Sequence, residues 1–162
     1  ERIEWLAGDG HIQFIEQPMP QTTDPRDLVW LKERSPLPLL ADESYHSARD
    51  TAHCAECFHG VNVKLVKTGG VSAGYEALKA ARAVGLKTMI GCMIETSISV
   101  AAAVHLAVAK SNVITKIDQD GPSLCTFNPV DGGVIFNEAE ISVTDAPGLG
   151  IREIRGLEPL AA

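Results

Sequence analysis

Long hydrophobic runs, an excess of basic residues and a dense set of cysteines are all absent from this sequence of 162 residues. No apolar run approaches the roughly 18 residues that a membrane-spanning helix needs, so we expect no membrane association. The formal net charge is −7, which argues against a nucleic-acid partner, because such domains usually carry a basic face. The four cysteines do not suggest a disulfide scaffold, and a reducing, cytoplasmic setting is expected.

The N-terminal stretch ERIEWLAGDG lacks an initiator methionine and a signal-peptide pattern. It has the character of the middle of a longer sequence, and we expect that upstream residues are missing. Apolar residues make up 45% of the chain and charged residues 22%, as in an ordinary globular domain with a sizeable core.

The segment HCAECFH, residues 53–59, contains a CxxC pair that could belong to a metal site. No second cysteine pair follows at the spacing of a zinc ribbon. The segment also continues a helical pattern that starts at Ser47. We therefore interpret Cys54 and Cys57 as part of an ordinary helix.

Short apolar runs alternate with longer helical patterns over most of the chain. We predict strands at 11–18, 37–44, 61–67, 87–92 and 113–122, and helices at 25–34, 47–59, 71–85 and 95–112. This alternation predicts parallel strands joined by crossover helices. A unit that recurs about every 25 residues fits a (β/α)₈ barrel or a doubly wound sheet. Five strands do not close an eight-stranded barrel, so the remaining strands would have to lie upstream.

Charged residues fall at the carboxyl ends of four of these five strands, namely Glu16, Asp42, Lys64 and Asp118. In α/β barrels that end carries ligands and chemistry, so the pattern predicts a shared active site. Glu16 and Asp42 suit a hard cation such as Mg²⁺, which prefers oxygen ligands. Alternatively, Glu16 forms a salt bridge at the barrel rim and Asp42 caps the helix after ADES.

Lys64 interrupts the apolar run VNVKLVK, where an unpaired ammonium costs several kcal/mol. Near a bound cation, burial and like charge would lower its pKa toward neutrality, where the amine can act as a base. Lys67 lies on the opposite face of an ideal strand or already in the loop. We interpret Lys67 as support for the site.

Two further acidic groups belong to the same candidate site. Asp118 and Asp120 in IDQDGP point the same way in an extended chain, which is unfavourable unless a cation is expected. That cation is either a second metal or a substrate ammonium. Glu95 either bonds to substrate or to Lys64, or caps the following helix together with Thr96.

Taken in order, FIEQPMP, LLADES, VNVKLVKTGGV, GCMIETSISVAAAVHLA and IDQDGP resemble the muconate-lactonizing subgroup of the enolase superfamily. The resemblance implies an α/β fold, namely the C-terminal part of a modified TIM (β/α) barrel that follows a capping domain. Residues 1–122 would supply about five βα units. Residues 123–162 would form an irregular segment that packs back on the barrel or capping domain. The capping domain and first strands, with a third metal carboxylate and a second lysine, would lie upstream.

The resemblance also implies roles for individual residues. Glu16 and Asp42 correspond to the Mg²⁺ ligands of the fourth and fifth barrel strands, and Lys64 to the acid/base lysine of the sixth. The Asp118–Asp120 pair is similar to that of the dipeptide epimerases, where it binds the free α-ammonium of the substrate. The implied reaction is a 1,1-proton transfer at the α-carbon of the dipeptide's C-terminal residue, through an enediolate. A homo-oligomer is expected.

Other members of the subgroup remain alternatives: o-succinylbenzoate synthase, N-acylamino-acid racemase and muconate cycloisomerase. Their substrates offer no ammonium at this position, so Asp118 and Asp120 are the discriminating residues. A non-catalytic truncated barrel is an alternative of a different class. Intact Glu16, Asp42 and Lys64 argue against it.

Overall fold

The computed structural model describes residues 1–156. Its centre is a five-stranded sheet with the order β1–β2–β3–β4–β5, in which every neighbouring pair is parallel. The strands are β1 (Ile15–Glu16), β2 (Leu39–Ala41), β3 (Gly60–Lys64), β4 (Lys87–Gly91) and β5 (Lys116–Asp118). The predicted parallel sheet of a partial barrel is therefore confirmed, with strands shorter than the sequence pattern indicated.

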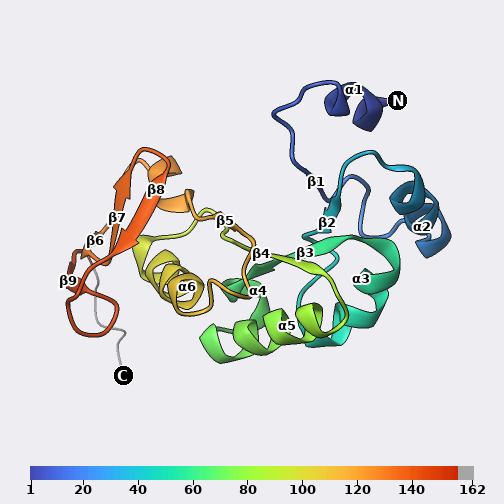
Figure 1. Cartoon of the computed structure of the whole chain (residues 1–162). Coiled ribbons are helices and arrows are strands. Elements are labelled where there is room, and N and C mark those ends of the chain that lie inside the picture. Colours follow the sequence, from blue (N-terminus) through green and yellow to red (C-terminus); the bar gives the residue numbers. More distant parts are fainter. Residues whose placement is uncertain (157–162) are drawn as a thin grey trace.

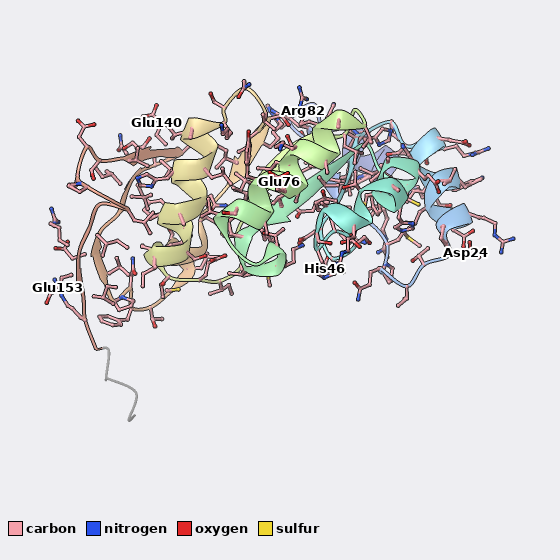
Figure 2. The ribbon with its side chains drawn as sticks, turned by 90° about the horizontal axis from the view of Figure 1, so that it is seen from below. Asp24, His46, Glu76, Arg82, Glu140 and Glu153 are labelled. Carbon is pink, nitrogen blue, oxygen red and sulfur yellow. The ribbon has the colours of Figure 1, made fainter. Side chains whose placement is uncertain are left out.

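Helices cover one face of this sheet. Figures 1 and 2 show four of them side by side along that face: α2 (Pro25–Arg34), α3 (Thr51–Cys57), α5 (Val71–Ala83) and α6 (Ser97–Ala109). The sequence explains their ends. Asp24 caps α2 by accepting a hydrogen bond from the Arg26 amide, with Pro25 at the first helical position. Gly85, at φ 81°, follows α5 in the left-handed conformation that a helix end favours.

Four short helical elements complete this part of the chain: α1 (Arg2–Ala7), η1 (Ala48–Asp50), α4 (Leu65–Thr68) and η2 (Gly121–Leu124). The prediction of a strand through residue 67 was wrong at its end. β3 stops at Lys64, and α4 follows at once, ending at Gly69 with φ 95°. None of the helices within residues 1–156 is long and apolar enough to cross a membrane.

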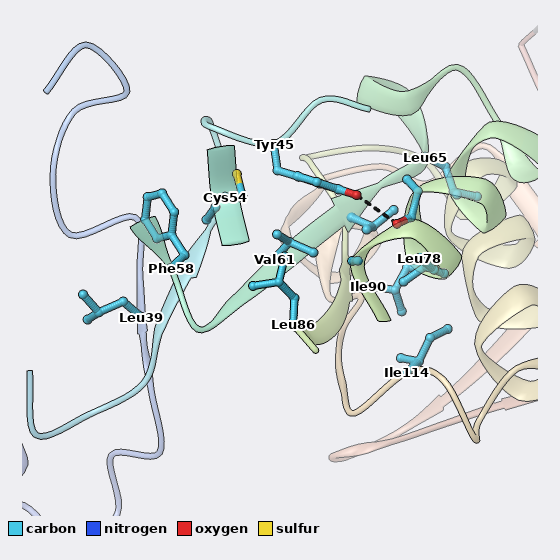
Figure 3. Close-up of a cluster of buried hydrophobic side chains, with 14 of the residues drawn as sticks. Leu39, Tyr45, Cys54, Phe58, Val61, Leu65, Leu78, Leu86, Ile90 and Ile114 are labelled. Atoms are coloured by element: carbon cyan, nitrogen blue, oxygen red, sulfur yellow. Dashed lines mark hydrogen bonds between the residues drawn. The ribbon is translucent and has the colours of Figure 1, made fainter. Parts of the chain in front are cut away.

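The main core lies between the sheet and the helices (Figure 3). Val61 and Val63 of β3 are fully buried in it. Tyr45 is also fully buried, and its hydroxyl donates to the Ala77 carbonyl of α5 at 2.8 Å. Because side chains alternate along a strand, Asn62 and Lys64 project from the other face, which we call the inner face.

Residues 130–154 form two antiparallel strand pairs. β6 (Val130–Gly132) pairs with β9 (Ile151–Ile154), and β7 (Val134–Asn137) pairs with β8 (Glu140–Val143). Val134 packs with Val100, Ala101 and Val104 of α6 in a second, smaller core. Figure 1 shows these strands beside α6, so the segment lies against the last helix of the sheet.

Candidate active site

The charged residues that were expected at strand ends lie there. Glu16, Lys64 and Asp118 are the last residues of β1, β3 and β5, and Asp42 directly follows β2. Lys64 pairs with Gly91 across the sheet, and Gly91 pairs with Asp118. The carboxyl-terminal edge of the sheet therefore carries three acids and a base.

Asp42 forms the centre of this edge, with two lysine ammonium groups on its carboxylate. Lys64 Nζ lies 2.7 Å from Oδ2, and Lys67 Nζ lies 2.5 Å from Oδ1 and 2.6 Å from the Asp42 carbonyl oxygen. The three side chains are 11–15% exposed, so water screens these pairs little. Lys67 reaches the site from α4, not from a strand as considered from the sequence.

The ion pairs set the protonation of this cluster. Burial opposes ionisation of Asp42, but the hydrogen bonds from Lys64 and Lys67 outweigh it and hold the Asp42 pKa below its ordinary value. Burial alone would lower the pKa of Lys64. The bond to Asp42 and its negative charge prevail, and the Lys64 pKa is raised. The expectation of a lowered Lys64 pKa applied to a lysine beside a bound cation and stays a prediction; here the nearest charge is the Asp42 carboxylate, and the pKa is raised.

Gln17 fixes the backbone on which Asp42 sits. Its Oε1 accepts from the amides of Asp42 at 2.9 Å and Ser44 at 3.2 Å. Its Nε2 donates to the Met19 carbonyl and to Ser44 Oγ. Gln17 has a φ of 37°, an uncommon conformation for a residue with a side chain. The side chain thus ties the end of β1 to the turn after β2.

Glu16 is held from a different strand. Asn62 Nδ2 of β3 donates to Glu16 Oε1 at 2.6 Å. Burial raises the pKa of Glu16, and the nearby negative charge of Asp42 adds to the rise, whereas the Asn62 bond opposes it. Two carboxylates close enough to repel each other are an arrangement that a divalent cation relieves.

Asp118 and Asp120 flank a buried residue at the end of β5. Gln119 is 1% exposed, whereas both aspartates are exposed, so the two acids avoid the core side of the chain. Burial and the charge of Asp120 raise the pKa of Asp118, and the charge of Lys64 opposes that rise. Asp120 has helical backbone angles at the start of η2, so the pair is not the straight extended stretch that the sequence suggested.

Glu95 makes neither of the contacts considered for it within the protein. Its Oε1 accepts from the Met93 amide at 2.8 Å, which closes the loop after β4. Thr96 is the N-cap of α6, without a side-chain capping bond. Lys64 instead contacts Met93, whose sulfur lies 3.6 Å from Nζ.

The candidate ligands are of the type that Mg²⁺ prefers, but the described residues supply only two of these carboxylates. Glu16 and Asp42 supply carboxylate oxygens, the ligands that Mg²⁺ prefers, and their mutual repulsion favours a cation between them. Residues 1–156 contain no group of three or more His, Cys, Asp or Glu side chains placed to hold a metal ion. Cys54 and Cys57 lie buried on α3, so the helix predicted for this segment is confirmed.

Sequence reasoning missed three residues of this site: Gln17, Asn62 and Gly91. Asn62 left a signal, because a polar side chain within a buried strand needs a partner. The partner itself lies 46 positions away and depends on how the sheet curves. Gln17 and Gly91 have no local pattern that marks them.

The comparison with protein families gives a match over nearly the whole chain. The family described as "Enolase C-terminal domain-like" matches residues 1–154. The chain belongs to this family. The expected membership of the enolase superfamily is thus confirmed.

Relatives in this family are named as epimerases. The chain is 58% identical over 153 residues to an L-Ala-D/L-amino acid epimerase of Pedosphaera parvula, covering 94% of this chain and 43% of that protein. It is 41% identical over 145 residues to an L-Ala-D/L-Glu epimerase of Clostridium acetobutylicum, covering 88% and 40%. The chain thus spans well under half the length of these relatives.

Solved structures agree with the fold. A substrate-liganded L-Ala-D/L-Glu epimerase from Bacillus subtilis superposes with a TM-score of 0.85 at 32% identity, covering 94% of this chain and 43% of that one. A dipeptide epimerase from Enterococcus faecalis, complexed with Mg and the dipeptide L-Leu-L-Tyr, gives a TM-score of 0.82 at 34% identity, covering 92% and 42%.

Proposed function

We propose that this chain supplies part of the active site of a Mg²⁺-dependent dipeptide epimerase. The observation that carries the proposal is the position of Lys64 at the sheet edge. Its ammonium lies 2.7 Å from Asp42, and β4 separates it by one strand from Asp118. The names of the relatives support the same reaction class.

Lys64 is the proposed acid/base group. In the pairing that the structure shows, Asp42 favours the ammonium form of Lys64, which is the form that can donate a proton to the α-carbon of the substrate. To remove the α-proton instead, Lys64 must first lose its own proton, which requires its ion pair with Asp42 to weaken. Lys67, on the other carboxylate oxygen, helps to share that negative charge.

Glu16 and Asp42 are the proposed holders of Mg²⁺. When bound, the ion supplies positive charge that stabilises the negative charge developing on the substrate carboxylate. The chain's own contribution is orientation: Gln17 fixes the Asp42 backbone, and Asn62 holds one oxygen of Glu16. A third carboxylate and an opposed second lysine would have to come from outside the described residues.

Asp118 and Asp120 are proposed to bind the free α-ammonium of the dipeptide. The charge of Asp120 helps to raise the pKa of Asp118, and a substrate ammonium would offset that repulsion. One peptide bond of the dipeptide would separate this ammonium-bearing residue from the α-carbon on which Lys64 acts. Glu95 is proposed to line the same pocket.

A chimera provides the test. Residues 1–154 replace the segment that they match in the Pedosphaera parvula epimerase, and epimerisation of L-Ala-L-Glu is followed by NMR in D₂O. We expect turnover of the free dipeptide. N-acetylation removes the ammonium and should cost about 1.5–3 kcal/mol of transition-state binding, the range for a charged hydrogen bond.

The intact relative serves as the positive control for both substrates. Equal processing of free and acetylated dipeptides would reject the role of Asp118 and Asp120 and favour an N-acylamino-acid racemase. A folded chimera without any epimerisation, under conditions in which the intact relative is active, would reject the proposed function.

A further inference from the structure

Asn62 is a buried amide that bonds to a single side chain. It is 1% exposed on the inner face of β3, and its Nδ2 donates to Glu16 Oε1 at 2.6 Å. β2 lies between the two strands in the sheet order, so the bond links strands that are not neighbours. Glu16 is only partly buried and otherwise free to take several rotamers.

Gly91 on the adjacent strand β4 leaves the room that this amide occupies. A Cβ atom placed on Gly91 would lie 2.5 Å from both Oδ1 and Nδ2 of Asn62. The flat carboxamide therefore occupies the space that any other residue at position 91 would fill. Any side chain at position 91 would therefore displace the amide from its place beside Glu16.

Charge decides which of the two flipped orientations the Asn62 amide adopts. With Nδ2 toward Glu16, a donor meets a carboxylate; a flipped amide would place two acceptors 2.6 Å apart. In this orientation Oδ1 is buried without a hydrogen-bond partner among the described residues, which is unfavourable. A leucine of similar shape would avoid that cost, so packing alone does not account for an amide here.

We propose that Asn62, for which Gly91 leaves room, is a positioning residue that presents Glu16 to a divalent cation. The bond occupies Oε1 and leaves Oε2 of Glu16 for the metal. Without it, the Glu16 carboxylate is free to turn toward the ammonium of Lys64, whose charge already acts on it. The inference rests on the proposed function, because it requires that Glu16 be a metal ligand.

The test uses Mn²⁺ as the probe and the 162-residue chain. Mn²⁺ broadens the NMR signals of nearby amides even when binding is weak, so its affinity is read from the signals of residues 15–17 and 42–44. Asn62→Leu is compared with Gln119→Leu. Gln119 is a matched control, because it is equally buried, also has an unpaired Oε1, and bonds only to the Ile90 carbonyl.

We expect Asn62→Leu to weaken Mn²⁺ binding by about 10-fold or more, the usual effect of losing a residue that orients a metal ligand. Gln119→Leu should stay within about twofold of the parent, since it leaves Glu16 untouched. Urea unfolding of both variants gives the fraction folded, so that a loss of affinity is not confused with a loss of structure.

A spectroscopic readout covers the case in which Asn62→Leu does not fold. In the parent chain the Asn62 side-chain NH₂ signal should be shifted downfield by its short bond to Glu16, and Glu16→Gln should move it back. An NH₂ signal that is unchanged by Glu16→Gln would overturn the proposal.

The positioning role of Asn62 and the metal site at Glu16 and Asp42 can be rejected separately. Parent affinity in folded Asn62→Leu would overturn the positioning role and leave the metal site standing. No Mn²⁺-dependent broadening of residues 15–17 and 42–44, either in the parent chain or in the chimera that restores the third carboxylate, would reject Glu16 and Asp42 as metal ligands, and the positioning role with them.

Discussion

Lys64 and Asp118 end their strands at the same level of the sheet, because both pair with Gly91 on the strand between them. Neighbouring strands lie about 4.8 Å apart, so the two backbones are about 10 Å from each other. The register places Lys64, Gly91 and Asp118 on the same face of the sheet, with the Lys64 ammonium turned toward Asp42. The Cα atoms of a dipeptide are about 3.8 Å apart, a length that fits between an acid/base group and an ammonium-binding group.

Replacing Lys64 by alanine should stop epimerisation in the chimera described above. One face of the substrate's α-carbon would lose its proton donor, so D₂O NMR should show no conversion between diastereomers. Deuterium exchange should survive for one enantiomer only, because the opposed lysine still removes its proton. Lys79→Ala is the control, since Lys79 forms an exposed pair with Glu76. Exchange from both enantiomers at parental rates would remove Lys64 from the mechanism.

The 162-residue chain by itself should not epimerise dipeptides. Its described part holds one candidate base and no group of three metal-binding carboxylates. We expect no conversion of L-Ala-L-Glu above the background rate in an overnight NMR assay with millimolar Mg²⁺. Turnover comparable with that of the intact relative would show that residues 1–162 contain a complete site that the structure does not reveal.

Tyr45→Phe should lower the free energy of unfolding by about 1–2 kcal/mol. The substitution removes the hydroxyl that donates to the Ala77 carbonyl and contacts Thr51 Oγ1 at 3.1 Å, in a fully buried position. Urea unfolding followed by circular dichroism measures the change. Tyr75→Phe is the matched control, because its hydroxyl makes no hydrogen bond within residues 1–156, and it should alter the midpoint little.

His59 should make the stability fall in mildly acidic solution. Its Nδ1 accepts from the Leu39 amide at 3.0 Å, and burial together with the charges of Lys32 and Lys87 lowers the pKa of its ring. The unfolded chain, with a pKa near 6.5, therefore binds the proton first. The stabilising contribution is complete above about pH 6.5 and is lost as the pH falls through the lowered folded-state pKa.

Urea midpoints between pH 7.5 and 5.5 check this sign. His59→Asn keeps an acceptor near the Leu39 amide but cannot titrate in this range, so the fall should become shallower. His46→Asn, at an exposed position, should leave the slope unchanged. A slope that is the same in the parent and in His59→Asn would contradict the prediction.

The sequence predicted those parts of the structure that depend on local order. The spacing of strands and helices placed Glu16, Asp42, Lys64 and Asp118 at one edge, because carboxyl ends of parallel strands meet there. It did not predict the contacts between them. Lys67 reaches Asp42 only because α4 begins directly after Lys64, and a four-residue helix leaves too short a pattern to detect.

The pKa of Lys64 shows the same limit. A lysine in an apolar run beside a bound cation was expected to have a lowered pKa, but the direction of the shift depends on which charge is nearest in space. That charge is Asp42, which is 22 positions away and is brought within 2.7 Å by the pairing of β2 with β3. The register between strands determines which charge lies nearest Lys64, and no single stretch of the sequence shows it.

The two lysines on Asp42 also bear on whether this site folds before or after an ion binds. With Lys64 and Lys67 in place, this carboxylate has its counter-charge as soon as the strands pair, whether or not an ion has arrived. The carboxyl-terminal edge of the sheet can therefore fold before a metal ion binds to it. If Asp42 binds Mg²⁺ as proposed, the ion would replace ammonium groups on this carboxylate, so that the chain without metal would keep the same counter-charge.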